Sequence, residues 1–316
     1  MEYRTLGRTG LQVSPLCLGT WLWTERNTAQ EGLAVIDQAI DDGVNFIDTS
    51  NVYNRGEAER VVGEGIKGRR DEVVLATKVF WPMDDDDPNA TGLSRKHVVG
   101  ECERSLKRLG TDYIDIYYLH RPDPKMPIEI TLRALDDLIS QGKVRYIASS
   151  CFTAAELVES LWKSEVGRWD AIVAEQPQYS LIRREPESDV VPYCAKYGVS
   201  LVPFSPLAGG LLTGKYRKNQ PPPEGARLTE WGQHEKGWWG EAMDVVEKLL
   251  PHVEIKGCTL SQFALAWVYS QPTVVSAIMG PRNAAQLTDN LGALEVEITA
   301  EDNALVNELV SPGTQI

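Results

Sequence analysis

Four titratable side chains of four different kinds could do chemistry together in this chain: Asp48, Tyr53, Lys78 and His120. Three of them directly follow short, mainly apolar runs, which cover residues 44–47, 73–77 and 114–119. Such a run, ended by a charged or polar residue, is typical of a buried parallel strand whose end carries a functional group. Tyr53 follows soon after Asp48, within reach of the same strand end. We therefore expect the four side chains to meet at one face of the fold.

Each of these residues alone also has a simpler structural explanation. Asp48 could cap a helix or form a buried ion pair. Tyr53 could pack its ring against apolar neighbours and leave its hydroxyl exposed to solvent. Lys78 could extend to solvent along an apolar surface, and His120 could be a structural histidine. The joint pattern favours function, because the active sites of parallel barrels are assembled from the ends of several strands.

Such a set of side chains indicates proton transfer to an oxygen. A phenol has an ordinary pKa of about 10 and is a poor acid at neutral pH. A buried ammonium beside it favours the phenolate and lowers that pKa, while a carboxylate keeps the ammonium charged. A neighbouring imidazole can orient the substrate oxygen. The set therefore suits an oxygen that becomes negative, as when a carbonyl accepts a hydride, and the hydride requires a redox cofactor.

The elements that would position these residues alternate along the chain. Apolar spacing and turn residues predict strands at residues 15–19, 44–48, 73–77, 114–119, 144–148, 171–175, 199–203 and 274–278. They predict helices at residues 28–42, 57–67, 94–109, 127–141, 154–163, 187–197, 240–250, 259–270, 284–291 and 300–309. Thr28 and Glu31 form a capping-box pattern, and Gly43 is placed to end the same helix.

Strand and helix repeat eight times, which is typical of a (β/α)8 TIM barrel. Residues 3–13 are predicted to form an N-terminal β-hairpin, and the pattern leaves two extra helices. A doubly wound parallel sheet is the competing fold, but it normally carries GxGxxG after its first strand, and this sequence has none there. We expect a single domain over residues 1–316, because α/β barrels of this length are routinely one domain.

The composition is that of an ordinary globular protein, 42% hydrophobic and 24% charged. A formal net charge of −13 argues against nucleic acid or an anionic membrane as the main partner. The five cysteines are scattered without CxxC or metal-ligand spacing, which favours reduced thiols. The N-terminus has no apolar signal region, and no apolar run reaches the roughly 18 residues of a spanning helix. We expect a cytoplasmic protein.

Two connections are unusual. Residues 84–87 are four consecutive aspartates, which could bind a divalent cation, but a solvated loop is favoured and no metal site is expected. Residues 207–240 contain three consecutive prolines and the tryptophans Trp231, Trp238 and Trp239. A connection this long is usually a lid or a binding loop, and the alternative is a surface excursion packed by its own tryptophans.

Several stretches resemble the aldo-keto reductase family, in particular the branch related to potassium-channel β subunits. They are residues 7–14, 18–20, 46–50 with Tyr53, 112–115 ahead of His120, and 206–215. The resemblance covers essentially the whole chain. It implies a barrel that binds NADP(H) across the C-terminal face of the strands. It also implies that Tyr53 is the general acid/base, that Asp48 and Lys78 tune it, and that His120 orients the carbonyl.

The same resemblance implies the residues that contact the cofactor. Ser150 and Gln176 would hold the nicotinamide carboxamide, and Phe204 would stack on the ring. The full expected set is Thr20, Trp21, Ser150, Gln176, Phe204, Ser205, Pro206, Leu207, Gly209, Leu211, Lys215, Gly280, Arg282, Gln286 and Asn290. Glycine permits close backbone approach to the pyrophosphate, and Lys215 supplies positive charge.

The chain departs from the family pattern at two places. Many NADP-specific members carry a lysine at the position of Gly280 and an arginine at that of Gln286, so NAD(H) stays open as the alternative cofactor. Arg282 could still pair with a 2′-phosphate. Cys151 stands where relatives commonly have asparagine, and a small buried hydrophobe is favoured there over a redox-active thiol.

The substrate pocket is expected to be lined by Trp21, Trp23, Trp81, Arg121 and Phe152. Arg121 could hold an anionic substrate group or pair with an acidic neighbour.

The expected function is reversible, NADP(H)-dependent reduction of aldehydes or ketones, with a small carbonyl or alcohol substrate. One alternative is a regulatory or sensor subunit that binds NADP(H) with little turnover. Another is a cofactor-free lyase that uses Lys78 as a Schiff-base amine. Assembly into a homo-oligomer is left open.

Overall fold

The computed structural model describes residues 1–218, 220–221, 223–226, 229 and 239–316. In this part of the chain, eight parallel strands form one sheet in the order β10-β3-β4-β5-β6-β7-β8-β9. Their bounds are β3 (Leu16–Gly19), β4 (Phe46–Asp48), β5 (Val74–Val79), β6 (Ile114–Leu119), β7 (Val144–Ser150), β8 (Ala174–Gln176), β9 (Ser200–Leu201) and β10 (Ala277–Met279). The sheet closes on itself, since Val275 N donates to Leu201 O (3.0 Å) and Ile278 N donates to Pro203 O (2.9 Å). The fold is the predicted (β/α)8 barrel.

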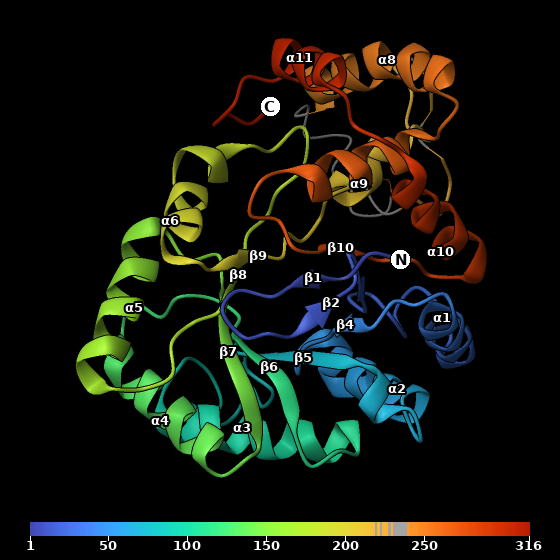
Figure 1. Ribbon diagram of the computed structural model, residues 1–316. Helices are drawn as coiled ribbons and strands as arrows, with labels where there is room; N and C mark the ends of the chain where they lie inside the picture. The colour runs from blue at the N-terminus through green and yellow to red at the C-terminus, as the bar shows by residue number, and fades with distance from the viewer. Residues whose placement is uncertain (219, 222, 227–228, 230–238) are drawn as a thin grey trace.

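Helices surround the sheet (Figure 1). Their bounds are α1 (Ala29–Asp41), α2 (Glu57–Gly65), α3 (Arg95–Leu109), α4 (Ile128–Ser140), α5 (Ala154–Gly167), α6 (Val190–Tyr197), α8 (Trp239–Lys256), α9 (Leu260–Ser270), α10 (Ala284–Leu291) and α11 (Ala300–Leu309). The predicted capping box of Thr28 and Glu31 is confirmed at the start of α1. Gly43, directly after that helix, has the left-handed φ of 88° that ends it.

Apart from α5, which continues four residues beyond its predicted end to Gly167, two helix boundaries differ from the prediction by three residues or more. α8 continues to Lys256, past Pro251, because Val253 on the far side of the proline is buried and keeps the last turns packed. α6 begins at Val190, later than predicted, because residues Glu185–Ser188 form a separate 3-10 turn that contains Pro186. Neither difference moves a strand end, so neither displaces the site.

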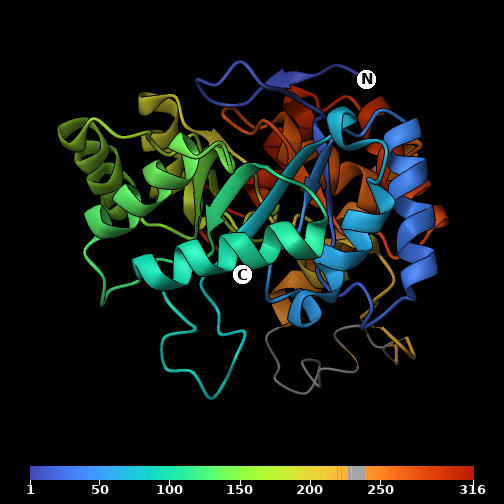
Figure 2. The ribbon, with the colours of Figure 1, turned by 90° about the horizontal axis from the view of Figure 1, so that it is seen from below.

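The predicted hairpin is present as β1 (Arg4–Thr5) and β2 (Gln12–Val13), paired antiparallel. Figure 2 shows it lying over one end of the strands, near the N-terminus. Leu6 and Val13 of the hairpin are fully buried and join the cluster inside the barrel, which includes Phe46 and Tyr118. The hairpin therefore fills the N-terminal end of the barrel with side chains and leaves the opposite end for a site.

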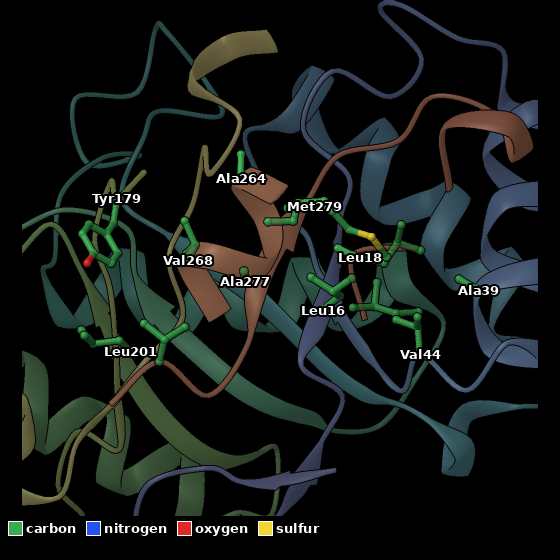
Figure 3. Packing of buried hydrophobic residues seen from close by; sticks show 14 of the residues in the cluster. Leu16, Leu18, Ala39, Val44, Tyr179, Leu201, Ala264, Val268, Ala277 and Met279 are labelled. Atoms are coloured by element: carbon green, nitrogen blue, oxygen red, sulfur yellow. The ribbon is translucent and has the colours of Figure 1, made fainter. Parts of the chain in front are cut away.

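The larger core lies between the sheet and the helices, and part of it is seen in Figure 3. Strand β6 shows why the strands appear in the sequence as mainly apolar runs. Ile116 and Tyr118 face the barrel interior, while Tyr117 and Leu119 face the helices, and all four are fully buried. A parallel strand that is covered on both faces carries mainly apolar residues, so a polar residue at its end stands out.

Candidate active site at the carboxyl ends of the strands

The ammonium of Lys78, near the end of β5, is at the centre of the site and is fully buried. It donates hydrogen bonds to Asp48 Oδ1, to Thr49 O (2.9 Å) and to the hydroxyl of Tyr53 (3.1 Å). Gln176 Nε2, at the end of β8, donates to the second carboxylate oxygen of Asp48 (3.0 Å). A buried ammonium with three acceptors and a satisfied counter-ion is the arrangement that makes a charge tolerable away from water.

The charge of Lys78 is retained despite its burial. Burial by itself lowers the pKa of Lys78, but the neighbouring Asp48 carboxylate and the Tyr53 hydroxyl outweigh it and raise that pKa above its ordinary value. The ammonium is therefore protonated at neutral pH. An amine that forms a Schiff base must first be neutral, so this environment opposes the role of Lys78 as a covalent nucleophile.

The phenol of Tyr53 is held beside this charge at the start of the turn Tyr53–Gly56. Burial raises the pKa of Tyr53 above 10, and the ammonium of Lys78 opposes this shift only in part. This direction differs from the expectation that the ammonium would produce a net decrease, because burial outweighs the single charge. The phenol is thus protonated at neutral pH. Its oxygen accepts from Lys78, so its own proton is directed elsewhere.

The backbone that follows Tyr53 is strained. Asn54 and Arg55 have left-handed φ values of 41° and 52°, which non-glycine residues rarely adopt. The side chain of Asn54 donates to Thr24 Oγ1 (2.5 Å), which lies in the loop after the neighbouring strand β3. Strain of this kind is concentrated at functional sites, where the surrounding structure holds the unusual conformation.

His120, just after β6, is the fourth member of the set. Its Nδ1 lies 3.1 Å from Ser50 Oγ, and its ring is edge-on to that of Tyr53 with centroids 5.9 Å apart. Burial and the positive charges of Lys78 and Arg121 hold the pKa of His120 well below 6.5. The imidazole is therefore neutral and carries a single N–H donor.

A cavity of about 650 Å³ opens onto these side chains. Asp48, Tyr53 and His120 line it, while Lys78 is buried behind them. Most of the other predicted residues also line it, namely Trp21, Trp81, Arg121, Ser150, Gln176, Phe204, Ser205, Pro206, Leu207, Gly209, Lys215, Gly280, Arg282, Gln286 and Asn290. The structure therefore brings together residues from positions 21 to 290.

Four predicted residues are placed elsewhere. Trp23 and Phe152 were predicted to line the substrate pocket, but both are buried in the core, and Trp23 Nε1 donates to Pro281 O (3.1 Å). Trp23 packs inward because Gly32 of α1 leaves room for its ring. Thr20 and Leu211 are fully buried and do not border the cavity, so any contact with a cofactor requires a change in their surroundings.

The segment after β9 has the backbone that an anionic ligand needs. Ser205, Ala208, Gly209 and Gly210 all have left-handed φ values. A Cβ on Gly210 would lie 3.1 Å from Lys215 Nζ, so the glycine allows the lysine to come close to the loop. Tight glycine turns beside a cation are a recurrent way to hold phosphate, and these residues fit the pyrophosphate of a dinucleotide.

Two side chains hold the backbone of the segment before α10 through hydrogen bonds to Arg282. Arg282 N donates to Gln286 Oε1 (2.9 Å), and Asn27 Nδ2 donates to Arg282 O (3.1 Å). The backbone of Arg282 is thus rigid while its side chain borders the cavity. Because the Gln286 amide is used to hold this backbone and Gly280 has no side chain, Arg282 is the cation that this segment contributes to the cavity.

Sequence analysis missed a further set of cavity residues, namely Gly19, Leu22, Glu25, Arg26, Val52, Asn54, Thr213, Ser261, Ile278, Met279 and Asp289. Most lie in loops or at strand ends, where no periodic pattern marks them. The one feature of the sequence that could have indicated any of them is that Glu25 and Arg26 follow soon after the end of the first predicted strand. The predicted lid aromatics Trp231 and Trp238, and the side chain of Trp239, lie outside the described residues.

A buried ionic network behind the site was also missed. Arg108 of α3 donates to Glu59 of α2 (2.5 Å) and to Glu101 of α3 (3.2 Å), and both glutamates are fully buried. Asn51 Nδ2, two residues before Tyr53, donates to Glu101 Oε2 (3.0 Å). The network therefore ties the loop that carries Tyr53 to the helix layer.

The turn after β7 is held by the buried carboxyl of Glu175, which accepts from Phe152 N (3.1 Å). Burial raises the pKa of Glu175 to about 8. Cys151 in this turn has a left-handed φ of 60°, and burial raises the pKa of its thiol. A thiol with a raised pKa is a poor nucleophile, so Cys151 remains a packing residue in this arrangement.

The aspartate run at residues 84–87 has partners of its own. Asp85 pairs with Arg55 (2.6 Å), Asp87 pairs with Lys96 (3.7 Å), and Asp84 accepts from the backbone of Asp86 (3.0 Å). Across the described residues, no group of three His, Cys, Asp or Glu side chains is arranged to hold a metal ion.

None of the helices that the structure describes is long and apolar enough to cross a membrane.

The arrangement can donate a proton from Tyr53 to an oxygen in the cavity, with a positive charge in place to stabilise the phenolate that remains. Comparison with known proteins gives the family. The model of the Aldo/keto reductase family matches residues 15–311.

Full-length relatives carry two kinds of name. The chain is 38% identical over 305 residues to a probable voltage-gated potassium channel subunit beta of Oryza sativa subsp. japonica, covering 94% of this chain and 92% of the relative. It is 36% identical over 319 residues to the uncharacterized oxidoreductase YrpG of Bacillus subtilis (strain 168), covering 98% and 96%. With the family model and the relatives both spanning nearly the whole chain, this protein belongs to the aldo/keto reductase family of oxidoreductases.

Proposed function

We propose that this protein reduces aldehydes or ketones with NADP(H), and runs the reverse oxidation of the alcohol, using Tyr53 as the general acid/base. The observation that carries this proposal is the hydrogen bond from the buried Lys78 ammonium to the Tyr53 hydroxyl (3.1 Å) on the wall of the cavity. A protonated phenol beside a fixed cation suits proton donation to an oxygen that gains negative charge.

The residues divide the reaction between them. When bound, a reduced nicotinamide supplies the hydride to the carbonyl carbon. The neutral His120 donates its single N–H to the carbonyl oxygen and orients it. Tyr53 transfers its phenolic proton to that oxygen as the alcohol forms. The phenolate left on Tyr53 is stabilised by Lys78, whose charge is balanced by Asp48.

NADP(H) is the proposed cofactor because two cations border the cavity where its phosphates would lie. Lys215 and the glycine turn suit the pyrophosphate, and the guanidinium of Arg282 suits a 2′-phosphate. Ser150 and Gln176 would hold the carboxamide, and Phe204 would stack on the nicotinamide ring.

The test is turnover of an aldehyde panel by Tyr53→Phe, with NADPH binding followed by tryptophan fluorescence. The variant should lose about 10²- to 10⁴-fold in kcat, which is typical of a removed general acid, and keep its cofactor affinity. Tyr146→Phe is the matched control, because Tyr146 donates to Thr9 O (3.2 Å) at the hairpin end of the barrel. Full turnover by Tyr53→Phe would remove Tyr53 from the acid role.

The name of the Oryza sativa relative, a probable channel subunit, favours a second candidate, a regulatory subunit. In this proposal the protein binds NADP(H) with little turnover. It predicts tight NADPH binding together with negligible turnover across the same aldehyde panel. Rapid multiple turnover by the wild-type protein would exclude this candidate.

A further inference from the structure

The guanidinium of Arg121 occupies an unusual position. Arg121 follows His120 directly at the end of β6, lines the cavity, and is half-buried. His120 beside it lies near Trp81, with ring centroids 6.5 Å apart, and Trp81 also lines the cavity. Arg121 thus places a permanent positive charge next to the residue proposed to orient the substrate carbonyl.

This charge has no acidic partner among the residues that the structure describes. Asp123, two positions away, directs its carboxylate oxygens to Leu93 N (2.9 Å) and Lys125 N (3.0 Å). Other largely buried arginines do form ion pairs, as Arg108 does with Glu59 (2.5 Å) and Arg184 with Glu187 (2.8 Å). The guanidinium of Arg121 lies instead against the thiol of Cys151, which is a weak acceptor.

The unpaired charge acts on the reaction centre. Together with burial and Lys78, Arg121 lowers the pKa of His120, and it also opposes the rise in the pKa of Tyr53. Arg121 therefore adds positive potential at the point where a carbonyl would lie, whereas the charge of Lys78 is balanced by Asp48. A positive potential in a partly buried cleft attracts anions and disfavours cations.

We infer that Arg121 is a specificity-determining residue, and that its guanidinium binds an oxyanion, a carboxylate or a phosphate, carried by the carbonyl substrate. This inference rests on the proposed function and adds the substrate class to it. An arginine fork matches the geometry of both oxyanions. Because Arg121 and His120 line the same cavity, one small substrate could place its carbonyl at His120 and its oxyanion at Arg121.

Matched substrate pairs test the inference with the NADPH-loaded protein. One pair is 4-carboxybenzaldehyde and its neutral analogue methyl 4-formylbenzoate, and a shorter pair is succinic semialdehyde and pentanal. A phosphate pair is glycolaldehyde phosphate and glycolaldehyde. We expect kcat/KM to favour the anionic member of at least one pair by about 10- to 100-fold, the range of a charge-assisted hydrogen-bonded pair. Comparison of the carboxylate pairs with the phosphate pair shows which oxyanion Arg121 prefers.

Variants assign the preference to Arg121. In Arg121→Met the anionic-to-neutral ratio should fall close to one, and Arg121→Lys should give an intermediate ratio because it keeps the charge but loses the fork. Arg145→Gln is the control, since Arg145 is an exposed residue of β7 outside the cavity, and it should keep the wild-type ratio. NADPH titration of each variant verifies that it is folded.

The outcomes separate this inference from the proposed function. Equal kcat/KM within every pair, or an unchanged ratio in Arg121→Met, would overturn the role of Arg121 while leaving carbonyl reduction intact. If no aldehyde is reduced, the proposed function fails, and binding of benzoate against benzamide to the NADPH-loaded protein decides the inference. Benzoate should then bind at least about 10-fold more tightly in the wild type and lose this advantage in Arg121→Met. Equal binding of the two would overturn the inference.

Discussion

At the scale of single residues, the site depends on one buried charge. The ammonium of Lys78 has no access to solvent and depends on Asp48, Thr49 and Tyr53 for its hydrogen bonds. Removal of one partner of a buried ion pair typically costs about 3–5 kcal/mol, because the other charge is left uncompensated. Loss of activity in an Asp48 variant would therefore mix instability with chemistry, which is why Tyr53 is the better residue to test.

The pKa shifts at the site predict the pH profile of the reduction. Tyr53 must be protonated to act as an acid, and burial raises its pKa above 10. His120 has its pKa held well below 6.5. We expect kcat/KM for reduction to be flat between about pH 6.5 and pH 9 and to fall at higher pH, as Tyr53 loses its proton. Steady-state rates at saturating NADPH measure this, and an inflection near pH 6.5 would contradict the neutral state of His120.

Cofactor preference is also a property of one residue. Arg282→Ala should weaken NADPH binding by about 10- to 100-fold, because it removes a charge-assisted pair with the 2′-phosphate, and should change NADH binding less than about threefold. Fluorescence titrations with both cofactors measure the two affinities. The control is Arg8→Ala, since Arg8 lies in the N-terminal hairpin, outside the residues that line the cavity. An equal loss for both cofactors would mean that Arg282 does not distinguish them.

At the scale of elements, strand ends deliver the side chains and the helix layer fixes the loops between them. The loop from Asp48 to Tyr53 contains no long regular element, so its shape depends on bonds to its neighbours. Asn51 provides one such bond through Glu101, which is in turn held by Arg108. The network lies outside the barrel interior, yet it acts on the residue proposed to donate the proton.

Asn51→Ala tests this coupling. Loss of the bond to Glu101 should let Tyr53 shift, and we expect kcat to fall by about 3- to 30-fold while NADPH affinity changes less than about threefold. Arg104→Ala is the matched control, because Arg104 bonds the other oxygen of Glu101 with a half-exposed side chain that does not reach the loop. If kcat falls equally in both variants, the effect is not specific to the bond from Asn51, and the proposed coupling of the network to Tyr53 is wrong.

At the scale of the whole molecule, the barrel carries α8 and α11 at its periphery (Figure 1). Asp302 of α11 joins them, since it lies 2.6 Å from His252 Nε2 and accepts from Lys256 Nζ (2.8 Å), both on α8. Its carboxylate also caps its own helix through Thr299 N (2.7 Å). Despite burial, these partners lower the pKa of Asp302 to about 2 from an ordinary 3.8.

A group whose pKa is lowered by folding stabilises the protein above its unfolded pKa, and this contribution is lost as the pH falls. Asp302→Asn should therefore lower the free energy of unfolding by about 1–3 kcal/mol at neutral pH. The difference from the wild type should shrink between about pH 4 and pH 2. Thermal unfolding across this range measures it, with the exposed Glu301→Gln as control. A difference that does not change with pH would contradict the ion pairs as its cause.

The local pattern of apolar and polar residues in the sequence predicted much of the fold and of the candidate site. The mainly apolar runs that end in Asp48, Lys78 and His120 predicted strands and their direction, because parallel strands buried on both faces are rich in apolar residues until they leave the core. Eight repeats of strand and helix then predicted the barrel, and the Thr28 and Glu31 pattern predicted the start of α1. From these, the convergence of the four side chains followed without any knowledge of distances.

The tertiary structure alone decided which neighbours surround each side chain. Trp21 and Trp23 are two residues apart, yet Trp21 borders the cavity while Trp23 enters the core, because Gly32 of another element leaves space there. The sequence likewise could not set the direction of the Tyr53 pKa shift, the unpaired state of Arg121, or the network around Glu101. The types of side chain and their positions along each strand are local properties, whereas burial, charge balance and free space depend on residues distant in the chain.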